Sequence, residues 1–399
     1  MVKSFILWLH KWLGLTTGIV VVILGLTGCV YTFFDELKLV CYPDRYILDQ
    51  RYHSSDALPL SQLKEIAGKQ LNDGESISRV DLYPEKNRSW IFRVQEIDPD
   101  AFGYWNYFKT YKRIFLNPYT GDLLFVENSK TEFFQVILQM HMNLLLGKKY
   151  GTWVVGISTI IFVVILISGM VLWWPKRWKG KPLKRSLWID WKSKWKRLNY
   201  DLHNVLGFYS FLISLVLAIT GLVFTYPSFK KAYISFFNSF DGSEIKKLEG
   251  EPFKIPNYYP EGEQLDNALH FLLEKYSNAG MMSIRSSKAE DETFDVQIRM
   301  TEMKTGDFRW YYFNKKENSI EKVTSSDNLK AGDQIGTLNY DIHTGNISGL
   351  PTKILAFLIS LICASLPITG FVVWRNKVKG QKRKAEKQIK KRDLLKSNQ

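Results

Sequence analysis

Four of the six histidines in this chain occupy matching places in the two halves of the sequence. His10 and His203 stand near the start of two long uncharged runs, in the similar segments Leu-His-Lys-Trp-Leu-Gly and Leu-His-Asn-Val-Leu-Gly. His141 and His343 each precede another uncharged run, and a glycine follows each of them six residues later. A lone histidine at a membrane border is usually an interfacial side chain, but a repeated set indicates function because burial is costly. We therefore expect His10 to pair with His203, and His141 with His343.

Two imidazoles that face each other from neighbouring helices suit a haem iron better than the alternatives. Zinc prefers four ligands, which include Cys, Asp or Glu, and the uncharged runs contain no Asp or Glu and no cysteine next to these histidines. A covalent c-type haem needs Cys-x-x-Cys-His, which the sequence lacks. The pattern predicts two haem b groups held by ligation and packing alone, with the four histidines as axial iron ligands, one pair near each face of a membrane. His53 and His270 lie in polar segments, and we assign them no ligand role.

Each uncharged run also carries a glycine preceded by Thr or Ser, and these glycines are Gly28, Gly169, Gly221 and Gly370. Gly28 and Gly221 follow His10 and His203 by 18 residues, which is five helical turns and about 27 Å along one helix face. We expect Gly169 and Gly370 near the first histidine pair, and Gly28 and Gly221 near the second. Small residues let a flat macrocycle approach the backbone, and they also let helices pack. Both roles remain open.

The elements that must position these residues are membrane helices. The four uncharged runs span 13–34, 151–174, 204–229 and 354–374. Each is long enough to cross a hydrocarbon core of ~30 Å, so the chain is expected to be a multi-pass membrane protein. The three cysteines indicate no disulfide framework, because Cys29 and Cys363 lie within runs and Cys41 lies just outside the first.

The distribution of the net charge of +15 predicts the topology. Ten basic residues crowd into 175–203 and eleven into 375–399, whereas the two large loops are nearly balanced in charge. The positive-inside rule then places both termini and the 175–203 connection in the cytoplasm, and both large loops in the periplasm. Basic segments of this kind contact anionic membrane lipid, so we expect no nucleic-acid partner. Five basic residues near helix ends could pair with haem propionates or simply anchor the helices: Lys11, Lys148, Lys149, Lys353 and Arg375.

Each large loop reads as a small α+β domain in which a helix precedes several strands. In the first loop, Ser61 is the expected N-cap of a helix that begins near Leu60. The predicted fold class is therefore a four-transmembrane-helix bundle formed by two internal repeats, with two extracytoplasmic α+β domains. The predicted segments are 1–34 (cytoplasmic lead and first membrane helix), 35–130 (first domain), 131–174 (amphipathic segment and second helix), 175–203 (basic connection), 204–229 (third helix), 230–342 (second domain), 343–374 (histidine segment and fourth helix) and 375–399 (basic tail).

Several motifs together resemble the PepSY-associated transmembrane family. They are His-Lys-Trp-Leu-Gly with its Thr-Gly at 10–14 and 27–28, Asn-Pro-Tyr-Thr-Gly-Asp at 117–122, His-Met-Asn-Leu-Leu-Leu-Gly at 141–147, and Ser-Gly-Met-Val-Leu-Trp-Trp-Pro at 168–175. The resemblance covers nearly the whole chain. It implies four helices, two periplasmic PepSY domains and, in the ferric-siderophore reductases of the family, two b-type haems. The second loop departs from the family because its turn lacks the Thr-Gly.

Two haems at opposite borders of the bilayer would form a path for electrons across it. The resemblance implies a ferric siderophore as the acceptor, because reduction to Fe(II) weakens its binding by hard oxygen ligands and releases the iron. The chain has no glycine-rich dinucleotide fingerprint and no flavin domain after Trp374, so we expect a separate cytoplasmic or quinol electron donor. No nucleophile has a recognisable partner, which argues against a hydrolase. Two alternatives remain: an electron conduit to another periplasmic redox partner, and a non-catalytic module whose PepSY domains bind a partner protein.

Overall fold

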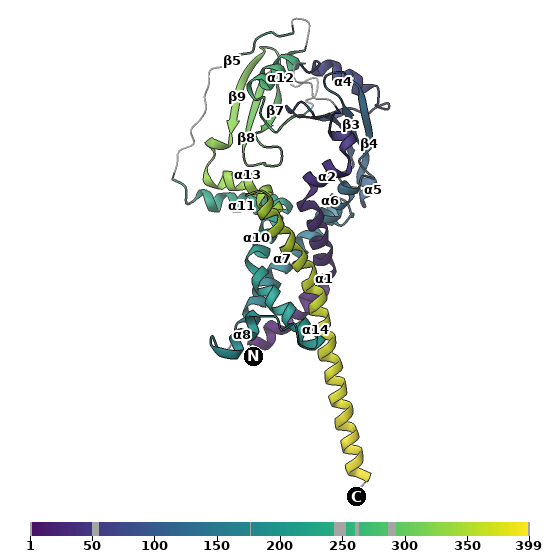
Figure 1. The fold of residues 1–399 in the computed structure, drawn as a ribbon, viewed down its shortest axis with the longest axis vertical. Coiled ribbons are helices and arrows are strands. Elements are labelled where there is room, and N and C mark those ends of the chain that lie inside the picture. The colour runs from purple at the N-terminus through teal and green to yellow at the C-terminus, as the bar shows by residue number, and fades with distance from the viewer. Residues whose placement is uncertain are drawn as a thin grey trace. The chain divides into compact units, whose positions relative to one another are not determined.

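The computed structural model describes residues 2–49, 56–175, 177–242, 253–259, 263–285 and 293–397, the last eight of these by their backbone alone. The chain forms two compact units (Figure 1). We name as the membrane unit Met1–Cys29, Val154–Leu222 and Ile354–Gln399, and as the sheet unit Val30–Trp153 and Val223–Lys353.

Four helical spans in the described residues are long and apolar enough to cross a membrane. The helices are α1 (Val2–Thr32), α7 (Lys148–Trp173), α10 (Gly207–Thr225) and α14 (Leu350–Ser397). Directly before α10 come α9 (Trp195–Asp201) and a five-residue π-helical turn (Leu202–Leu206), so the third span runs from Trp195 to Thr225. These spans confirm the predicted multi-pass membrane protein.

The helices of the membrane unit pack through small side chains, as membrane helices commonly do. A Cβ atom added to Gly25 of α1 would lie 2.9 Å from Cβ of Ala364 in α14, so the two backbones approach closely there. Between α10 and α14, the Ser214 hydroxyl lies 3.1 Å from Sγ of Cys363. This packing brings side chains from all three helices near the bundle interior.

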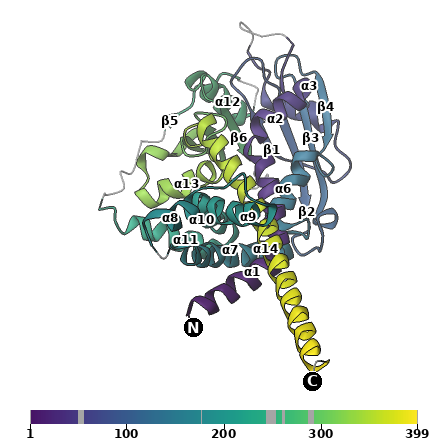
Figure 2. The same cartoon turned by 60° about the horizontal axis from the view of Figure 1, so that its bottom comes forward.

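The basic segments of the membrane unit are partly helical. The 175–203 connection contains α8 (Gly180–Leu187) before α9. The segment predicted as a basic tail continues α14 without a break as far as Ser397. Figures 1 and 2 both show this C-terminal part of α14 as a single long helix in yellow.

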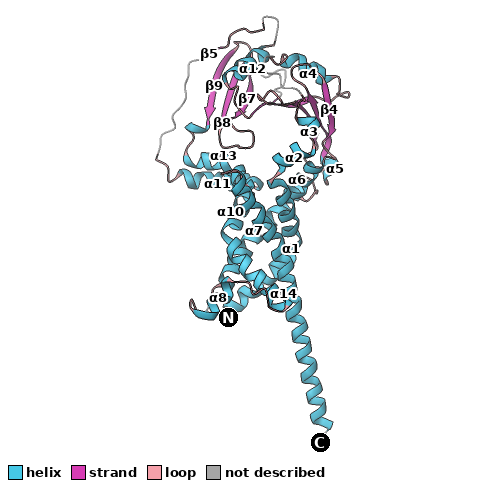
Figure 3. Cartoon of the chain, viewed as in Figure 1, coloured by secondary structure: helices cyan, strands magenta, loops and turns pink. Residues whose placement is uncertain are grey.

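The sheet unit is built on one antiparallel sheet of nine strands, drawn in magenta in Figure 3. Their order is β4-β3-β2-β1-β6-β7-β8-β9-β5. The strands are β1 (Ile77–Leu82), β2 (Trp90–Ile97), β3 (Phe108–Leu116), β4 (Leu123–Asn128), β5 (Phe253–Lys254), β6 (Met281–Arg285), β7 (Thr293–Arg299), β8 (Phe308–Asn314) and β9 (Ser319–Ser325).

The central pair of strands, β1 and β6, joins the two loops that the sequence predicts as separate domains. Their register places Val80 opposite Ile284 and Asp81 opposite Ser283. Every other strand pairs only with strands of its own loop. The two sets of strands therefore share one continuous sheet.

Two helices, α4 (Leu60–Gly68) and α12 (Gln264–Lys275), contribute to the main core with the sheet. Leu60 and Leu272 are fully buried in this core, together with Phe92 and Val296 from the strands. Burial alternates along β7, because successive side chains point to opposite faces of the sheet; one face is buried in the core and the other is partly exposed. The predicted N-cap Ser61 is wrong, because Pro59 occupies that position. Ser61 lies inside the helix and donates its hydroxyl to the Asp266 carboxylate at 2.6 Å.

The remaining helices of the sheet unit lie before, between or after the strands along the chain. In each half, the last of these helices follows the strands and comes directly before a membrane helix. These helices are α2 (Phe34–Cys41), α3 (Pro43–Tyr46), α5 (Tyr104–Tyr107), α6 (Phe133–Asn143), α11 (Pro227–Asn238) and α13 (Ala331–Thr344), with a single 3-10 turn at Ser326–Asn328.

Candidate functional site

The membrane unit brings His10 and His203 together. His10 lies in α1, and His203 lies in the π-helical turn at the start of α10. Their ring centroids are 6.3 Å apart and their planes are nearly perpendicular, at 84°. A π-helical turn changes the direction of its side chains relative to a regular helix and is frequent at functional sites.

Hydrogen bonds to α7 fix the orientation of the His10 ring. Its Nδ1 lies 3.2 Å from the carbonyl oxygen of Ile165 and 2.9 Å from the hydroxyl of Ser168. A carbonyl oxygen can only accept, so Nδ1 carries the proton and donates it. The Ser168 hydroxyl donates to the same Ile165 carbonyl at 3.0 Å, which leaves its lone pairs for the histidine. Nε2 of the neutral ring therefore carries a lone pair that can bind a metal.

His203 has the equivalent arrangement on α14. Its Nδ1 lies 3.1 Å from the carbonyl oxygen of Leu366 and 3.0 Å from the hydroxyl of Thr369. Thr369 donates its hydroxyl proton to the Leu366 carbonyl at 3.0 Å. The same argument leaves Nε2 of His203 as the metal-binding nitrogen. Hydrogen bonds of this kind to the second nitrogen orient metal-binding histidines and raise their basicity.

Gly169 and Gly370 make room for these two rings. A Cβ atom at Gly169 would lie 3.2 Å from Cε1 of His10, and one at Gly370 would lie 3.1 Å from Cε1 of His203. Both distances are tighter than ordinary van der Waals contact. These glycines therefore lie next to the first histidine pair, as predicted. The group for which they leave space is the imidazole ring itself.

The sheet unit brings His141 and His343 together, with their ring centroids 6.0 Å apart and their planes at 65°. The two residues lie in the last turns of α6 and α13. Each helix ends in a left-handed residue, Leu144 and Gly345 respectively. The ring of Phe224 packs edge-on against His343 at 5.6 Å.

The glycines that follow these histidines by six residues have a structural reason. Gly147 has φ of +81° and Gly349 has φ of +71°, a left-handed conformation that glycine adopts without strain. Gly147 stands just before α7, and Gly349 just before α14. The repeated spacing of histidine and glycine therefore marks the turn between an amphipathic helix and a membrane helix.

Both pairs fit a haem iron. Two imidazoles that bind one ion from opposite sides have centroids about 6 Å apart, because each metal–nitrogen bond is about 2 Å long and each nitrogen lies about 1 Å from its ring centre. The observed distances between centroids are 6.3 Å and 6.0 Å. Within the described residues, no three side chains of His, Cys, Asp and Glu converge as a metal site would require. Two nitrogen ligands and nothing further suit the axial positions of a haem, whose four equatorial ligands belong to the porphyrin.

The other predicted site residues are placed as follows. Gly28 lies in α1 and Gly221 in α10, within the membrane unit, so their proximity to the second histidine pair stays a prediction. The Lys353 side chain is 2% exposed and binds the Glu36 carboxylate at 2.7 Å, and Lys149 binds Asp100 at 2.9 Å. His53 lies outside the described residues.

Sequence reasoning missed the roles of the Ser168 and Thr369 hydroxyls. The signal was present, because each precedes one of the marked glycines. Only the glycine was given a role, since the spacing along one helix does not show which neighbouring helix a hydroxyl will face.

Four membrane-crossing spans, two pairs of facing histidines and an antiparallel sheet unit define a multi-pass membrane protein of the α+β kind with paired imidazole sites. The family model described as the PepSY-associated TM region matches residues 7–377, and the chain belongs to this family. No curated protein matches the chain.

Proposed function

We propose that this protein is an inner-membrane di-haem b reductase that passes electrons across the membrane to a periplasmic ferric siderophore, so that Fe(II) is released for uptake. Its electron donor would be a separate cytoplasmic protein, a reduced flavin or a quinol. Both termini would be cytoplasmic, and the sheet unit would be periplasmic and in contact with membrane lipid through its flanking helices. The two halves of the sheet unit would be PepSY-like domains from an internal repeat, joined through β1 and β6.

The observation that carries this proposal is the spacing of the two imidazole pairs. Four histidines at four separate positions form two pairs, and the ring centroids of each pair lie about as far apart as those of two imidazoles that bind one iron ion. His10 and His203 would hold one haem, and His141 and His343 the other. When bound, each haem would supply one-electron transfer at a potential set by its axial ligands and its burial.

The chain's own residues would tune this chemistry. Ser168 and Thr369, with the neighbouring carbonyl groups, hold the first pair of rings by Nδ1. A fixed ring orientation lowers the reorganisation that accompanies a change of charge at the metal. A module whose helices served only as anchors would need neither the pairing nor these hydrogen bonds, and this favours the redox function over the binding module.

The test is the visible spectrum and haem content of the purified full chain, expressed with haem supplied. We expect two haems per chain, with His10→Ala and His203→Ala each losing the same one, and His141→Ala and His343→Ala each losing the other. His270→Ala is the matched control, because that ring packs against Tyr258 with ring centroids 4.3 Å apart, and His270 lies in α12, which carries none of the four predicted ligands. No Soret band in the wild type would refute the redox proposal.

The acceptor is tested by mixing the dithionite-reduced protein with a ferric siderophore under argon. We expect rapid reoxidation of the haem spectrum together with the appearance of Fe(II). Haem that stays reduced would exclude the ferric chelate and leave the electron conduit to another partner.

A further inference from the structure

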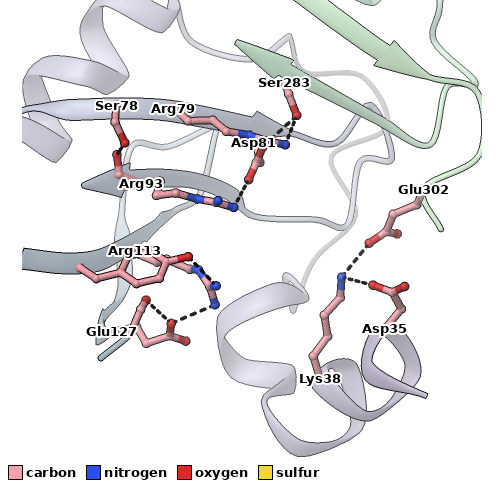
Figure 4. A network of polar contacts seen from close by, with 12 residues as sticks. Asp35, Lys38, Ser78, Arg79, Asp81, Arg93, Arg113, Glu127, Ser283 and Glu302 are labelled. Atoms are coloured by element: carbon pink, nitrogen blue, oxygen red, sulfur yellow. Dashed lines mark hydrogen bonds and ion pairs between the residues drawn. The ribbon is translucent and has the colours of Figure 1, made fainter. Parts of the chain in front are cut away.

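The sheet unit contains a cavity of about 260 Å³ that none of the predicted site residues explains. Five cationic side chains line it, from α2, β1, β2, β3 and β7: Lys38, Arg79, Arg93, Arg113 and Arg299. Figure 4 shows Arg79, Arg93 and Arg113 on neighbouring strands, with Lys38 on the adjacent helix. Strands of both loops contribute, so the cavity depends on the pairing of β1 with β6.

The carboxylate at the centre of this cluster is fully engaged. Asp81 accepts from Nε of Arg79 at 2.6 Å, from Arg93 at 3.1 Å and from the Ser283 hydroxyl at 2.9 Å. Its side chain is 5% exposed. Asp81 therefore organises two guanidinium groups and offers little to a ligand.

The other lining carboxylates are engaged as well. Asp35 and Glu302 lie 3.0 Å and 3.4 Å from Nζ of Lys38. Glu132 caps α6, because its two carboxylate oxygens accept from the backbone N–H groups of Phe134 and Gln135 at 2.9 Å and 2.7 Å. Each lining carboxylate therefore already has hydrogen-bond or ion-pair partners within the protein.

Donors, in contrast, remain available. Among the described residues, the guanidinium of Arg299 forms no hydrogen bond or close ion pair, although it interacts electrostatically with the Asp341 carboxylate. Nε of Arg93 is buried without an acceptor. Burial would raise the pKa of the Tyr111 phenol, but Arg113 and Arg93 outweigh burial and bring that pKa below its ordinary value. Five cationic and four anionic side chains line the cavity, so its formal net charge is +1.

The cavity adjoins the second histidine pair through two helices. Leu138 of α6 and Tyr340 of α13 line the cavity, and each stands three residues before the histidine of its helix, His141 or His343. Three residues are about 4.5 Å of helix. A molecule in the cavity would therefore lie roughly one helical turn from the imidazole pair.

We propose that this cavity binds a small anionic ferric chelate whose ligands are carboxylates, as in ferric citrate. This inference rests on the proposed function for the choice of iron. Guanidinium groups bind carboxylates in a planar two-bond geometry that suits such a ligand. The volume lies below the range of about 300–1,000 Å³ typical of pockets for drug-sized ligands, which indicates a compact chelate. A cationic or neutral hydroxamate chelate would leave the Arg299 guanidinium and Nε of Arg93 without an anionic partner.

The experiment is titration calorimetry of the purified full chain in detergent with gallium(III) citrate, which has the charge and shape of the ferric complex but is not reduced. The test variant is Arg299→Gln, because this guanidinium forms no hydrogen bond or close ion pair within the described residues. The Asp341 carboxylate, with which it interacts electrostatically, keeps its hydrogen bonds from the backbone N–H groups of Thr305 and Gly306. Arg285→Gln on the neighbouring strand β6 is the matched control, because its side chain is exposed and does not line the cavity. The haem spectrum and the melting curve of each variant are recorded on the same samples.

We expect gallium citrate to bind the wild type and Arg285→Gln equally, and Arg299→Gln about tenfold or more weakly, as for the loss of one charged hydrogen bond. Arg299→Lys should recover part of the affinity. Equal binding of the neutral gallium tris(acetohydroxamate), or of citrate without metal, would overturn the inference. So would an Arg299→Gln variant that loses haem, because the arginine would then serve the cofactor. If the wild type contains no haem when haem is supplied but still binds gallium citrate, the cavity assignment stands and only the proposed function is refuted.

Discussion

Each histidine of the membrane pair has one nitrogen committed to a neighbouring helix and one available to a ligand. Nδ1 of each ring lies within hydrogen-bond distance of a backbone carbonyl oxygen of the neighbouring helix. It also lies within hydrogen-bond distance of a Ser or Thr hydroxyl, which itself donates to the same carbonyl. The following glycine then lets the ring lie against the backbone. The Ser-Gly pair of α7 and the Thr-Gly pair of α14 thus each bind one imidazole ring, the hydroxyl by a hydrogen bond and the glycine by close packing.

This arrangement predicts that Gly169→Ala and Gly370→Ala are destabilising. The added methyl group would crowd the His10 or His203 ring and cost about 1–3 kcal/mol, the usual penalty for overpacking. Thermal unfolding of the full chain in detergent measures this penalty. Gly14→Ala is the control, since a Cβ there has no atom within 4 Å and alanine favours a helix by up to about 1 kcal/mol over glycine. Equal melting temperatures for Gly14→Ala and Gly169→Ala would contradict the assignment.

Among the elements, the junction of β1 with β6 unites the two loops. Asp81 of β1 binds Ser283 of β6 across this junction as well as two arginines of its own loop. Burial raises the pKa of the Asp81 carboxyl, but Arg93 and Arg79 outweigh burial and hold that pKa below its ordinary value. The ionised form of Asp81 is therefore the one that stabilises the folded sheet unit.

The sign of the pH dependence follows from this depressed pKa. The stabilisation by Asp81 is fully present above the unfolded-state pKa of about 3.9, and it is lost as the pH falls through the lower folded-state pKa. Asp81→Asn should cost about 3–5 kcal/mol at pH 7, because two guanidinium groups lose their buried partner. Urea unfolding, followed by circular dichroism at several pH values, should show the difference from wild type shrinking below about pH 4.

Glu96→Gln is the control for this measurement, because Glu96 pairs with Lys109 at 3.3 Å and both side chains are more than half exposed. Its effect should be small at every pH. A penalty for Asp81→Asn that stays constant down to pH 2 would show that the carboxylate charge does not matter.

The whole molecule offers a native probe of its orientation in the membrane. Of its three cysteines, Cys41 is exposed and lies in the sheet unit, whereas Cys29 and Cys363 are buried. A membrane-impermeant maleimide should therefore label one thiol per chain. With the sheet unit in the periplasm, spheroplasts should be labelled without rupture, and Cys41→Ser should abolish the label. Labelling that requires rupture would place the sheet unit in the cytoplasm.

Much of the fold could be predicted because its signals are local. The four membrane spans follow from uncharged runs long enough to cross a bilayer, and most strands follow from alternation and turn residues. The strand β9 has no such alternation, because it is rich in polar and charged residues, and it is held in the sheet by its pairing with β8. The N-cap prediction for Ser61 is wrong because local sequence could not show that its hydroxyl bonds to Asp266, which lies 205 residues further along the chain.

By itself the sequence determined that His10 belongs with His203 and His141 with His343, because duplicated motifs in equivalent helices report equivalent places. Only the tertiary structure decided that β1 joins β6, that Ser168 and Thr369 hold imidazole rings, and that arginines from several strands line one cavity. Those features depend on which faces of distant segments meet. The periodicity of a segment indicates which of its faces is buried, but it does not indicate which other segment covers that face. That depends on how the elements pack in three dimensions.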